Sequence, residues 1–244
     1  MQLLWMNGHV ELAEQAAGRV AALFRDNPRA VVALPTGATP RGMYERLATL
    51  HRADKFSCRE ARFFNLDEFV GLPPDNPCSY AAYLWRHFFR RVDADPTRIR
   101  TLRGDASDLE AECRAYDQAI KAAGGLDLAI LGLGRNGHVA FNEPSSDWQA
   151  TTHRVTLTES TRRAQRQQFP SGEAIPRQGL TMGLRTLREA RSILLLVAGA
   201  GKEAGLAALR ADAPDPIWPV TALLDHPNLV VLADRNHGAQ AGAS

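Results

Sequence analysis

The chain of 244 residues has few cysteines and no long apolar run, and each of these absences excludes a class of protein. Its three cysteines, Cys58, Cys78 and Cys113, form no CxxC spacing, so we expect reduced thiols rather than a disulfide framework or a zinc site. No apolar run approaches the roughly 18 residues of a membrane span, and the first residues lack the basic flank of a signal peptide. These absences predict a cytoplasmic protein without a membrane partner.

The chain also lacks an excess of charge. It carries 29 Lys and Arg against 27 Asp and Glu, and a net charge of +2 is too small to indicate a nucleic-acid partner. Basic residues gather at Arg86–Arg91 and Arg162–Arg166, where we expect solvated helix faces. The content of 45% hydrophobic and 23% charged residues is typical of a globular protein, and the length suffices for one domain over residues 1–244.

Short apolar runs alternate with amphipathic segments. Strands are expected at 30–34, 62–66, 128–131, 154–157, 194–197 and 229–232, followed by a small polar tail. Helices are expected over 9–25 and 79–91. Two more are expected, one after an N-cap at Thr39 with Pro40 in the first turn, and one after a capping box of Ser107 and Glu110. This alternation predicts the α/β class, with a single doubly wound, mostly parallel sheet covered by helices on both faces.

The most informative turn follows the expected strand at 128–131. It reads Gly-Leu-Gly-Arg-Asn-Gly-His-Val-Ala-Phe-Asn-Glu-Pro over 132–144 and delivers His138 and Glu143. Ligands of open α/β sheets bind at the carboxyl ends of the strands, where glycines mark tight turns. An imidazole and a carboxylate close to such a turn form a candidate proton-handling pair, which favours an enzyme.

The same turn contains a dinucleotide-like pattern. Gly132, Gly134 and Gly137 satisfy G-x-G-x-x-G, and Glu159 falls where a ribose-binding acid would be expected. Pro144, however, leaves little room for the crossover helix of a dinucleotide fold. We therefore expect no nicotinamide cofactor.

Three further strand-end turns carry polar groups. The turn Thr36-Gly-Ala-Thr-Pro40 is typical of an anion-binding site at a helix N-terminus, although a purely structural helix cap is an equally good interpretation of the isolated motif. Of the adjacent carboxylates of Asp67 and Glu68, one should point into a pocket and the other away from it, although an acidic loop is the commoner explanation of such a pair. Lys202 follows a glycine turn and could meet a phosphate, but lone lysines at strand ends are usually just exposed.

Taken in order, these segments resemble a known family. Thr-Gly-x-Thr-Pro (36–40), Asn-Leu-Asp-Glu-Phe-Val-Gly-Leu-Pro (65–73), Gly-x-Asn-Gly-His-x-Ala-Phe-Asn-Glu-Pro (134–144) and Gly-Lys (201–202) resemble glucosamine-6-phosphate deaminase/isomerases along almost the whole chain. Residues 124–143 are also similar to galactosamine-6-phosphate deaminase/isomerases. The 6-phosphogluconolactonases share the Gly-His turn but typically lack Asn-Glu-Pro.

The resemblance implies conversion of a hexosamine 6-phosphate and water to a ketohexose 6-phosphate and ammonia, without metal or organic cofactor, in a monomer or homo-oligomer. Asp67 would be the base that moves a proton from C2 to C1, and His138 would assist ring opening. Glu143 would orient the imidazole. Residue 136 is aspartate in some members and asparagine in others, and Asn136 is counted with the catalytic group here.

The phosphate site carries a departure from the family pattern. The resemblance assigns the phosphate to the turn formed by Thr36, Gly37, Ala38 and Thr39 and to Lys202. An arginine often found on the phosphate falls at Gln167, and Arg166, one position away, is the candidate replacement. Galactosamine-type relatives also lack that arginine, so the C4 epimer of the sugar stays open.

Allosteric regulation is not expected, and two competing functions stay open. Basic residues that line the allosteric site of hexameric members fall at His153 and Val155, so the resemblance implies no activation by N-acetylglucosamine 6-phosphate. Hydrolysis of a 6-phosphogluconolactone and non-catalytic sensing of a sugar phosphate are the two competing functions. The sensor is disfavoured because no helix-turn-helix segment precedes residue 30 and because Asp67, His138 and Glu143 are all retained.

Overall fold

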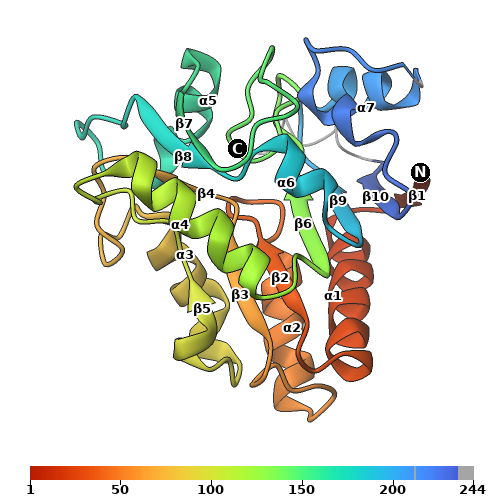
Figure 1. Cartoon of the computed structure of the whole chain (residues 1–244). Coiled ribbons are helices and arrows are strands. Elements are labelled where there is room, and N and C mark those ends of the chain that lie inside the picture. Colours follow the sequence, from red (N-terminus) through yellow and green to blue (C-terminus); the bar gives the residue numbers. More distant parts are fainter. Residues whose placement is uncertain (212, 236–244) are drawn as a thin grey trace.

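A parallel sheet forms the centre of the protein (Figure 1), whose computed structural model describes residues 1–211 and 213–235. Its strand order is β1-β10-β9-β6-β2-β3-β5, and every neighbouring pair is parallel. The bounds are β1 (Gln2–Met6), β2 (Val31–Leu34), β3 (Arg62–Asn65), β5 (Ile99–Arg100), β6 (Leu128–Gly132), β9 (Ile193–Val197) and β10 (Leu229–Asp234). Most of the polar tail lies outside the described residues.

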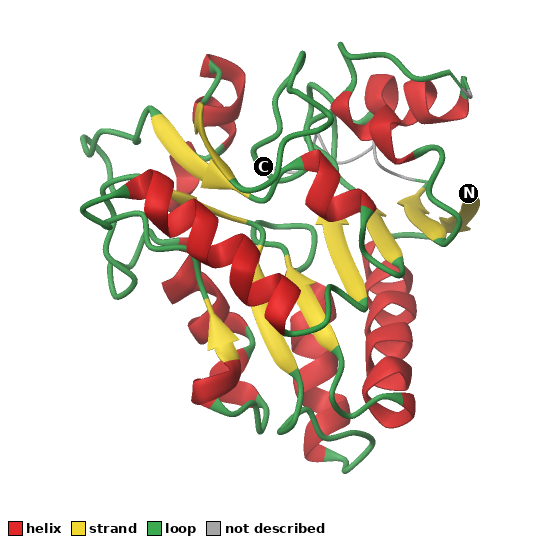
Figure 2. Ribbon diagram, viewed as in Figure 1, coloured by secondary structure: helices red, strands yellow, loops and turns green. Residues whose placement is uncertain are grey.

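Side chains of the central strands alternate between two cores, as the two-residue period of a strand requires. Val32 and Leu34 pack with one core, whereas Val31 and Ala33 pack with the other. The first core includes residues of α1 (His9–Asp26), α2 (Arg41–Arg52) and α3 (Tyr80–His87), and the second includes residues of α4 (Leu109–Ala122), α6 (Leu184–Arg188) and α7 (Glu203–Arg210). Helices cover both faces of the sheet (Figure 2), which confirms the doubly wound α/β prediction.

A small antiparallel sheet, absent from the sequence-based expectation, lies beyond the carboxyl ends of β2 and β3 (Figure 1). It has the order β4-β8-β7, with bounds β4 (Asp67–Phe69), β8 (Gln178–Thr181) and β7 (His153–Thr156). Phe69, Phe141 and Phe169 form a third apolar core with Tyr80 against it. Only β7 was expected as a strand, because β4 and β8 are short and lack an apolar run.

Several element boundaries differ from the expectation. Pro40 has helical backbone angles, but the Thr39 side chain makes no capping hydrogen bond to the described residues. Helix α4 begins one residue later than the proposed capping box, because Asp108 rather than Ser107 accepts from the Ala111 amide at 2.9 Å. The edge strand β1 was missed because its side chains are mostly half-buried.

The remaining elements are short. Helix α5 spans Glu159–Ala164. The 3₁₀ turns are η1 (Phe89–Arg91), which continues the helix expected to reach residue 91, η2 (Pro96–Arg98), η3 (Arg166–Gln168) and η4 (Pro219–Leu223). Over the part of the chain that the structure describes, none of the helices has the length and apolar character needed to cross a bilayer. The three cysteines are buried and unpaired.

Candidate active site

The sheet topology brings the candidate site residues to one edge. Strand order reverses between β2 and β6, because the chain continues from β2 to β3 on one side and from β6 to β9 on the other. Such a reversal opens a crevice at the carboxyl ends of the strands. The turns after β9, β6, β2 and β3 carry Lys202, His138, Thr36–Thr39 and Asp67, and these strands are consecutive in the sheet. Neighbouring strands lie only about 4.8 Å apart, so one small molecule can span several of these turns.

Asp67 stands at the corner where the chain leaves the main sheet for β4. Its side chain is buried, with 6% of the residue exposed, and it makes no hydrogen bond to any other described residue. Burial, assisted by the neighbouring Glu68 charge, raises the pKa of Asp67 well above its usual value. An unbonded carboxyl with a raised pKa is suited to take and return a proton.

Glu68 faces away from Asp67 and has a structural role. Its carboxylate accepts hydrogen bonds from the amides of Tyr80 and Ala81, both at 2.9 Å, at the start of α3. Burial raises the pKa of Glu68 to about 7, although the amide hydrogen bonds act in the opposite sense. As expected, one of the two carboxylates points away from the other. It is that of Glu68, which lies at a helix N-terminus, where negative charge is favourable.

Tyr80 joins two of the turns and was not singled out from the sequence. Its side chain is buried, and Thr36 and Asp67 both lie close enough for their side chains to act on the phenol. Burial raises the pKa of Tyr80 well above 10, so the hydroxyl keeps its proton. In the sequence Tyr80 was only one of several aromatic residues on an apolar helix face.

Asn136 links the imidazole to the carboxylate. Its Nδ2 donates to Glu143 Oε2 at 2.7 Å, and its Oδ1 lies 2.7 Å from His138 Nδ1. His138 Nδ1 and Glu143 Oε2 themselves are 3.8 Å apart. The other oxygen, Glu143 Oε1, accepts from the amide and hydroxyl of Thr158. The three side chains thus form one chain of contacts in which Asn136 is the middle member.

The contacts of Asn136 fix the tautomer of His138. The Glu143 carboxylate only accepts, so the Asn136 amide must turn its NH₂ toward it and its carbonyl oxygen toward the imidazole. His138 Nδ1 must then carry the proton, which leaves Nε2 with a free lone pair. Burial lowers the pKa of His138 below its usual value, with Lys202 acting in the same sense and Glu143 against it. The imidazole is therefore neutral at pH 7 and can accept a proton at Nε2.

The turn after β2 has free amides. Tyr83 donates to Gly37 O and Tyr44 donates to Pro35 O, both at 2.6 Å, so the turn is held through its carbonyl groups. Gly37 has φ +97°, a conformation that favours glycine. The N–H groups of Gly37, Ala38 and Thr39 donate to none of the described residues. Free amides just before helix α2 suit an anion.

Lys202 lies at the N-terminus of α7, on the far side of His138 from this turn. Burial lowers its pKa to about 8, and the positive charge of Arg135 acts in the same sense. Arg166, the expected replacement arginine, makes its hydrogen bonds within its own loop. Its guanidinium donates to the carbonyl groups of Phe169, Pro170 and Glu173, and the neighbouring Gln167 is exposed. Within residues 1–211 and 213–235, no cluster of three or more His, Cys, Asp or Glu side chains has the arrangement of a metal site.

Known proteins resemble this chain over nearly its full length. A 41% identical relative, glucosamine-6-phosphate deaminase from Geobacillus sp. (strain WCH70), matches over 97% of this chain and 94% of its own. Glucosamine-6-phosphate deaminase 1 from Bacillus subtilis (strain 168) is 40% identical, over 96% of this chain and 97% of its own. The solved structure of a monomeric glucosamine-6-phosphate deaminase superposes with a TM-score of 0.95 at 39% identity, covering 97% of this chain and 98% of its own.

More distant structures share the fold. A 6-phosphogluconolactonase from Thermotoga maritima superposes with a TM-score of 0.75 at 23% identity, covering 96% of this chain and 99% of its own. A sequence model of the family described as glucosamine-6-phosphate isomerases/6-phosphogluconolactonase matches residues 9–231. The chain belongs to this family.

Proposed function

We propose that this protein is a glucosamine-6-phosphate deaminase, which converts glucosamine 6-phosphate and water to fructose 6-phosphate and ammonia. The observation that carries the proposal is the pairing of an unbonded buried carboxyl, Asp67, with a neutral imidazole, His138, at the same sheet edge. Relatives of 41% and 40% identity bear the name of this activity. No cofactor is needed, because both proton transfers use side chains of the chain itself.

The first step opens the pyranose ring. His138 Nε2 takes the proton of the O1 hydroxyl and returns it to the ring oxygen as the C1–O5 bond breaks, which leaves an aldehyde at C1. Asn136 holds Nδ1 protonated throughout, and the Glu143 carboxylate stabilises the imidazolium that forms between the two transfers. A neutral resting imidazole is the state that this step requires.

The second step moves a proton between carbons. Asp67 removes the proton from C2, the electrons of the C2–H bond form a C1–C2 double bond, and the carbonyl oxygen takes a proton from the C2 ammonium group of the substrate, giving a neutral enolamine. Asp67 then returns its proton to C1, the nitrogen lone pair forms an iminium at C2, and water replaces ammonia there. A base with a raised pKa is suited to both directions of transfer.

The phosphate group provides the handle that positions the sugar. In the proposed complex the free amides of Gly37, Ala38 and Thr39, the hydroxyl of Thr39 and the ammonium of Lys202 bind the dianion. Arg166 has no part in the proposed site because three backbone carbonyls occupy its guanidinium.

The test is side-by-side turnover of three substrates by the purified protein. Ammonia release coupled to fructose 6-phosphate formation is measured with glucosamine 6-phosphate and galactosamine 6-phosphate, and hydrolysis is measured with 6-phosphogluconolactone. Faster turnover of glucosamine 6-phosphate supports the proposal. Faster turnover of the galactosamine epimer or of the lactone would replace it by that activity, and tight binding of all three without turnover would indicate a sensor.

The alkaline side of the pH profile tests Lys202. A lysine with a pKa of about 8 loses its charge as the pH rises through that value, so kcat/KM is expected to fall above pH 8 while kcat falls less. The Lys202→Arg variant keeps its charge at all these pH values, and its kcat/KM should stay level where that of the wild type falls. A decline caused by the amino group of the substrate would be the same in both enzymes and would contradict the assignment to Lys202.

Allosteric activation is not expected. His153 and Val155 occupy positions in β7 where hexameric family members carry basic residues, so an anionic effector lacks its partners. Initial rates with and without N-acetylglucosamine 6-phosphate should give the same hyperbolic curve. An effector that sharpens or accelerates the reaction would contradict this prediction. Light scattering in the same buffer decides between the proposed monomer and homo-oligomer.

We further propose that residues 1–244 form one domain located in the cytoplasm. All the central strands belong to one sheet with a core on each face, and the three unpaired cysteines are suited to a reducing compartment.

A further inference from the structure

Arg135 lies in the loop that carries His138, between Gly134 and Asn136, and its side chain crosses the turn that carries Lys202. A Cβ atom placed on Gly201 would lie 3.4 Å from both Cγ and Cδ of Arg135 and 3.5 Å from Nε. The arginine stem, as far as Nε, therefore packs directly over Gly201, which is the residue next to Lys202. Two turns that follow different strands, β6 and β9, thus bring two cations together.

Within residues 1–211 and 213–235 the exposed Arg135 guanidinium makes no ion pair or hydrogen bond, so its donors are open to a ligand. Its positive charge lies close enough to the Lys202 ammonium to lower the pKa of that lysine, in addition to the effect of burial. Glu203 acts on Lys202 in the opposite sense and to a smaller extent. Adjacent like charges cost free energy in the empty site, and an anion between them removes that cost.

Arg135 is, in addition, an arginine at the site whose donors are free. Arg166 is held by three carbonyl groups, and position 167 is an uncharged glutamine. A guanidinium offers paired N–H groups that match two phosphate oxygens, which a lysine ammonium does not. Arg135 also belongs to the turn that carries His138, three residues later, so it lies on the same strand end as the proposed ring-opening group.

We infer that Arg135 is the second cationic ligand of the substrate phosphate, beside Lys202. The inference rests on the proposed function, because it names a binding residue within that same site. Arg135 binds the phosphate from the β6 side, Lys202 binds it from the β9 side, and the amides of the turn at Thr36–Thr39 complete the site.

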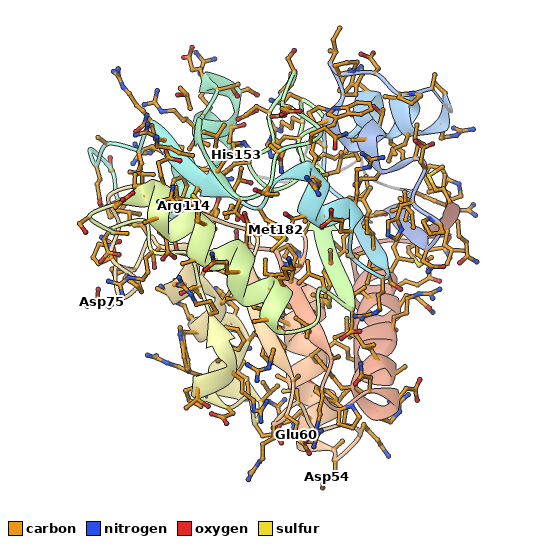
Figure 3. All side chains as sticks on the ribbon, in the orientation of Figure 1. Asp54, Glu60, Asp75, Arg114, His153 and Met182 are labelled. Atoms are coloured by element: carbon orange, nitrogen blue, oxygen red, sulfur yellow. The ribbon has the colours of Figure 1, made fainter. Side chains whose placement is uncertain are left out.

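The experiment compares Arg135→Gln and Arg135→Lys with the wild type and with Arg29→Gln as a matched control. Arg29 pairs with Glu60, which lies at the end of the molecule opposite to His153 (Figure 3). Two readouts are measured: KM and kcat for glucosamine 6-phosphate, and the dissociation constant of inorganic phosphate by calorimetry, which needs no turnover. Thermal unfolding verifies that each variant is folded.

Arg135→Gln is expected to raise both KM and the phosphate dissociation constant by about tenfold or more, because a hydrogen bond to a charged group is lost. Its kcat should stay within about threefold of the wild type. Arg135→Lys should recover part of the loss, and Arg29→Gln should change neither value. Values within about twofold of the wild type in Arg135→Gln would overturn the inference.

The two proposals fail separately. Weaker phosphate binding in Arg135→Gln, together with a wild type that does not turn over glucosamine 6-phosphate, would keep the anion ligand and reject the deaminase. Normal turnover and unchanged phosphate binding in Arg135→Gln would keep the deaminase and reject the ligand. If Arg135→Gln unfolds, the folded Arg135→Lys variant decides. A phosphate dissociation constant and a KM equal to those of the wild type, at low salt and at high salt, would reject a bidentate arginine contact.

Discussion

Replacing Asp67 by asparagine is expected to lower kcat by about three orders of magnitude, within the usual range for loss of a general base. The amide cannot take a proton from C2, whereas its size and shape match those of the carboxyl. Because the Asp67 carboxyl makes no hydrogen bond to other described residues, and its backbone contacts with Asn65 and Thr181 are unaffected, the substitution breaks no contact that holds the fold. Removing a buried carboxyl with a raised pKa should leave the midpoint of thermal unfolding unchanged or slightly higher.

The control for this experiment is Asp75→Asn, the same change in an exposed loop residue at the edge of the molecule (Figure 3). Its kcat and KM should equal those of the wild type. The dissociation constant of inorganic phosphate should be nearly the same in Asp67→Asn and the wild type, since the phosphate site lies on other turns. An Asp67→Asn enzyme that keeps full rate would show that the base is a different residue.

The pH profile gives a second measure of Asp67. The base works only when ionised, and burial raises its pKa, so kcat should fall as the pH drops through that raised value. The acid limb should therefore lie well above the pH at which an exposed aspartate gains its proton, near 3.9. The residual activity of Asp67→Asn should lack this limb.

The sequence was sufficient to place Asp67 and His138 because both follow short apolar runs. A parallel sheet brings the carboxyl ends of its strands to one edge, so a polar residue directly after a strand has a predictable position. Lys202 and the turn at Thr36–Thr39 could be placed in the same way. Where the chain order of strands differs from their spatial order, as in β9-β6-β2-β3, the sequence pattern gives no neighbour relations, and these come from the structure.

Residues that act through side-chain geometry could not be assigned from the pattern. Tyr80 has the apolar spacing of a core residue, yet Thr36 lies close enough to act on its phenol. Asn136 was placed in the catalytic group by the resemblance alone, and its 2.7 Å contact with Glu143 depends on the turn between them, which contains an isolated bridge between Val139 and Asn142. Arg166 was one position from the expected arginine, but the backbone direction of η3 turns it to carbonyl groups.

The small sheet illustrates a different limit. Strand β4 begins at Asp67 itself, only two residues after β3 ends, so a sequence pattern cannot separate the two strands. The chain changes direction there because Asp67 pairs with Thr181 of the antiparallel sheet, a contact between residues far apart in sequence. This long-range pairing holds the proposed catalytic carboxyl in place, and local propensity does not predict it.

Replacing Gly134 by alanine is expected to lower kcat/KM by about 100-fold, because a displacement of about 1 Å at a catalytic group can cost that much. A Cβ atom at this position would lie 2.4 Å from Cγ, Cδ2 and Cε1 of His138, closer than van der Waals contact allows. The imidazole would have to move away from Asn136 Oδ1, which it meets at 2.7 Å. The Gly134 amide also donates to the His138 carbonyl at 2.8 Å, so backbone and ring cannot both keep their places.

Gly132→Ala is the matched control, since a Cβ atom there meets nothing within 4 Å. It adds the same methyl group two residues earlier, at the last residue of β6, and its kcat/KM should be within about twofold of the wild type. Binding of inorganic phosphate by Gly132→Ala should equal that of the wild type, because the added methyl group meets nothing within 4 Å. A Gly134→Ala enzyme as active as Gly132→Ala would mean that the position of the imidazole over Gly134 is not required, and His138 would then lose its assigned role.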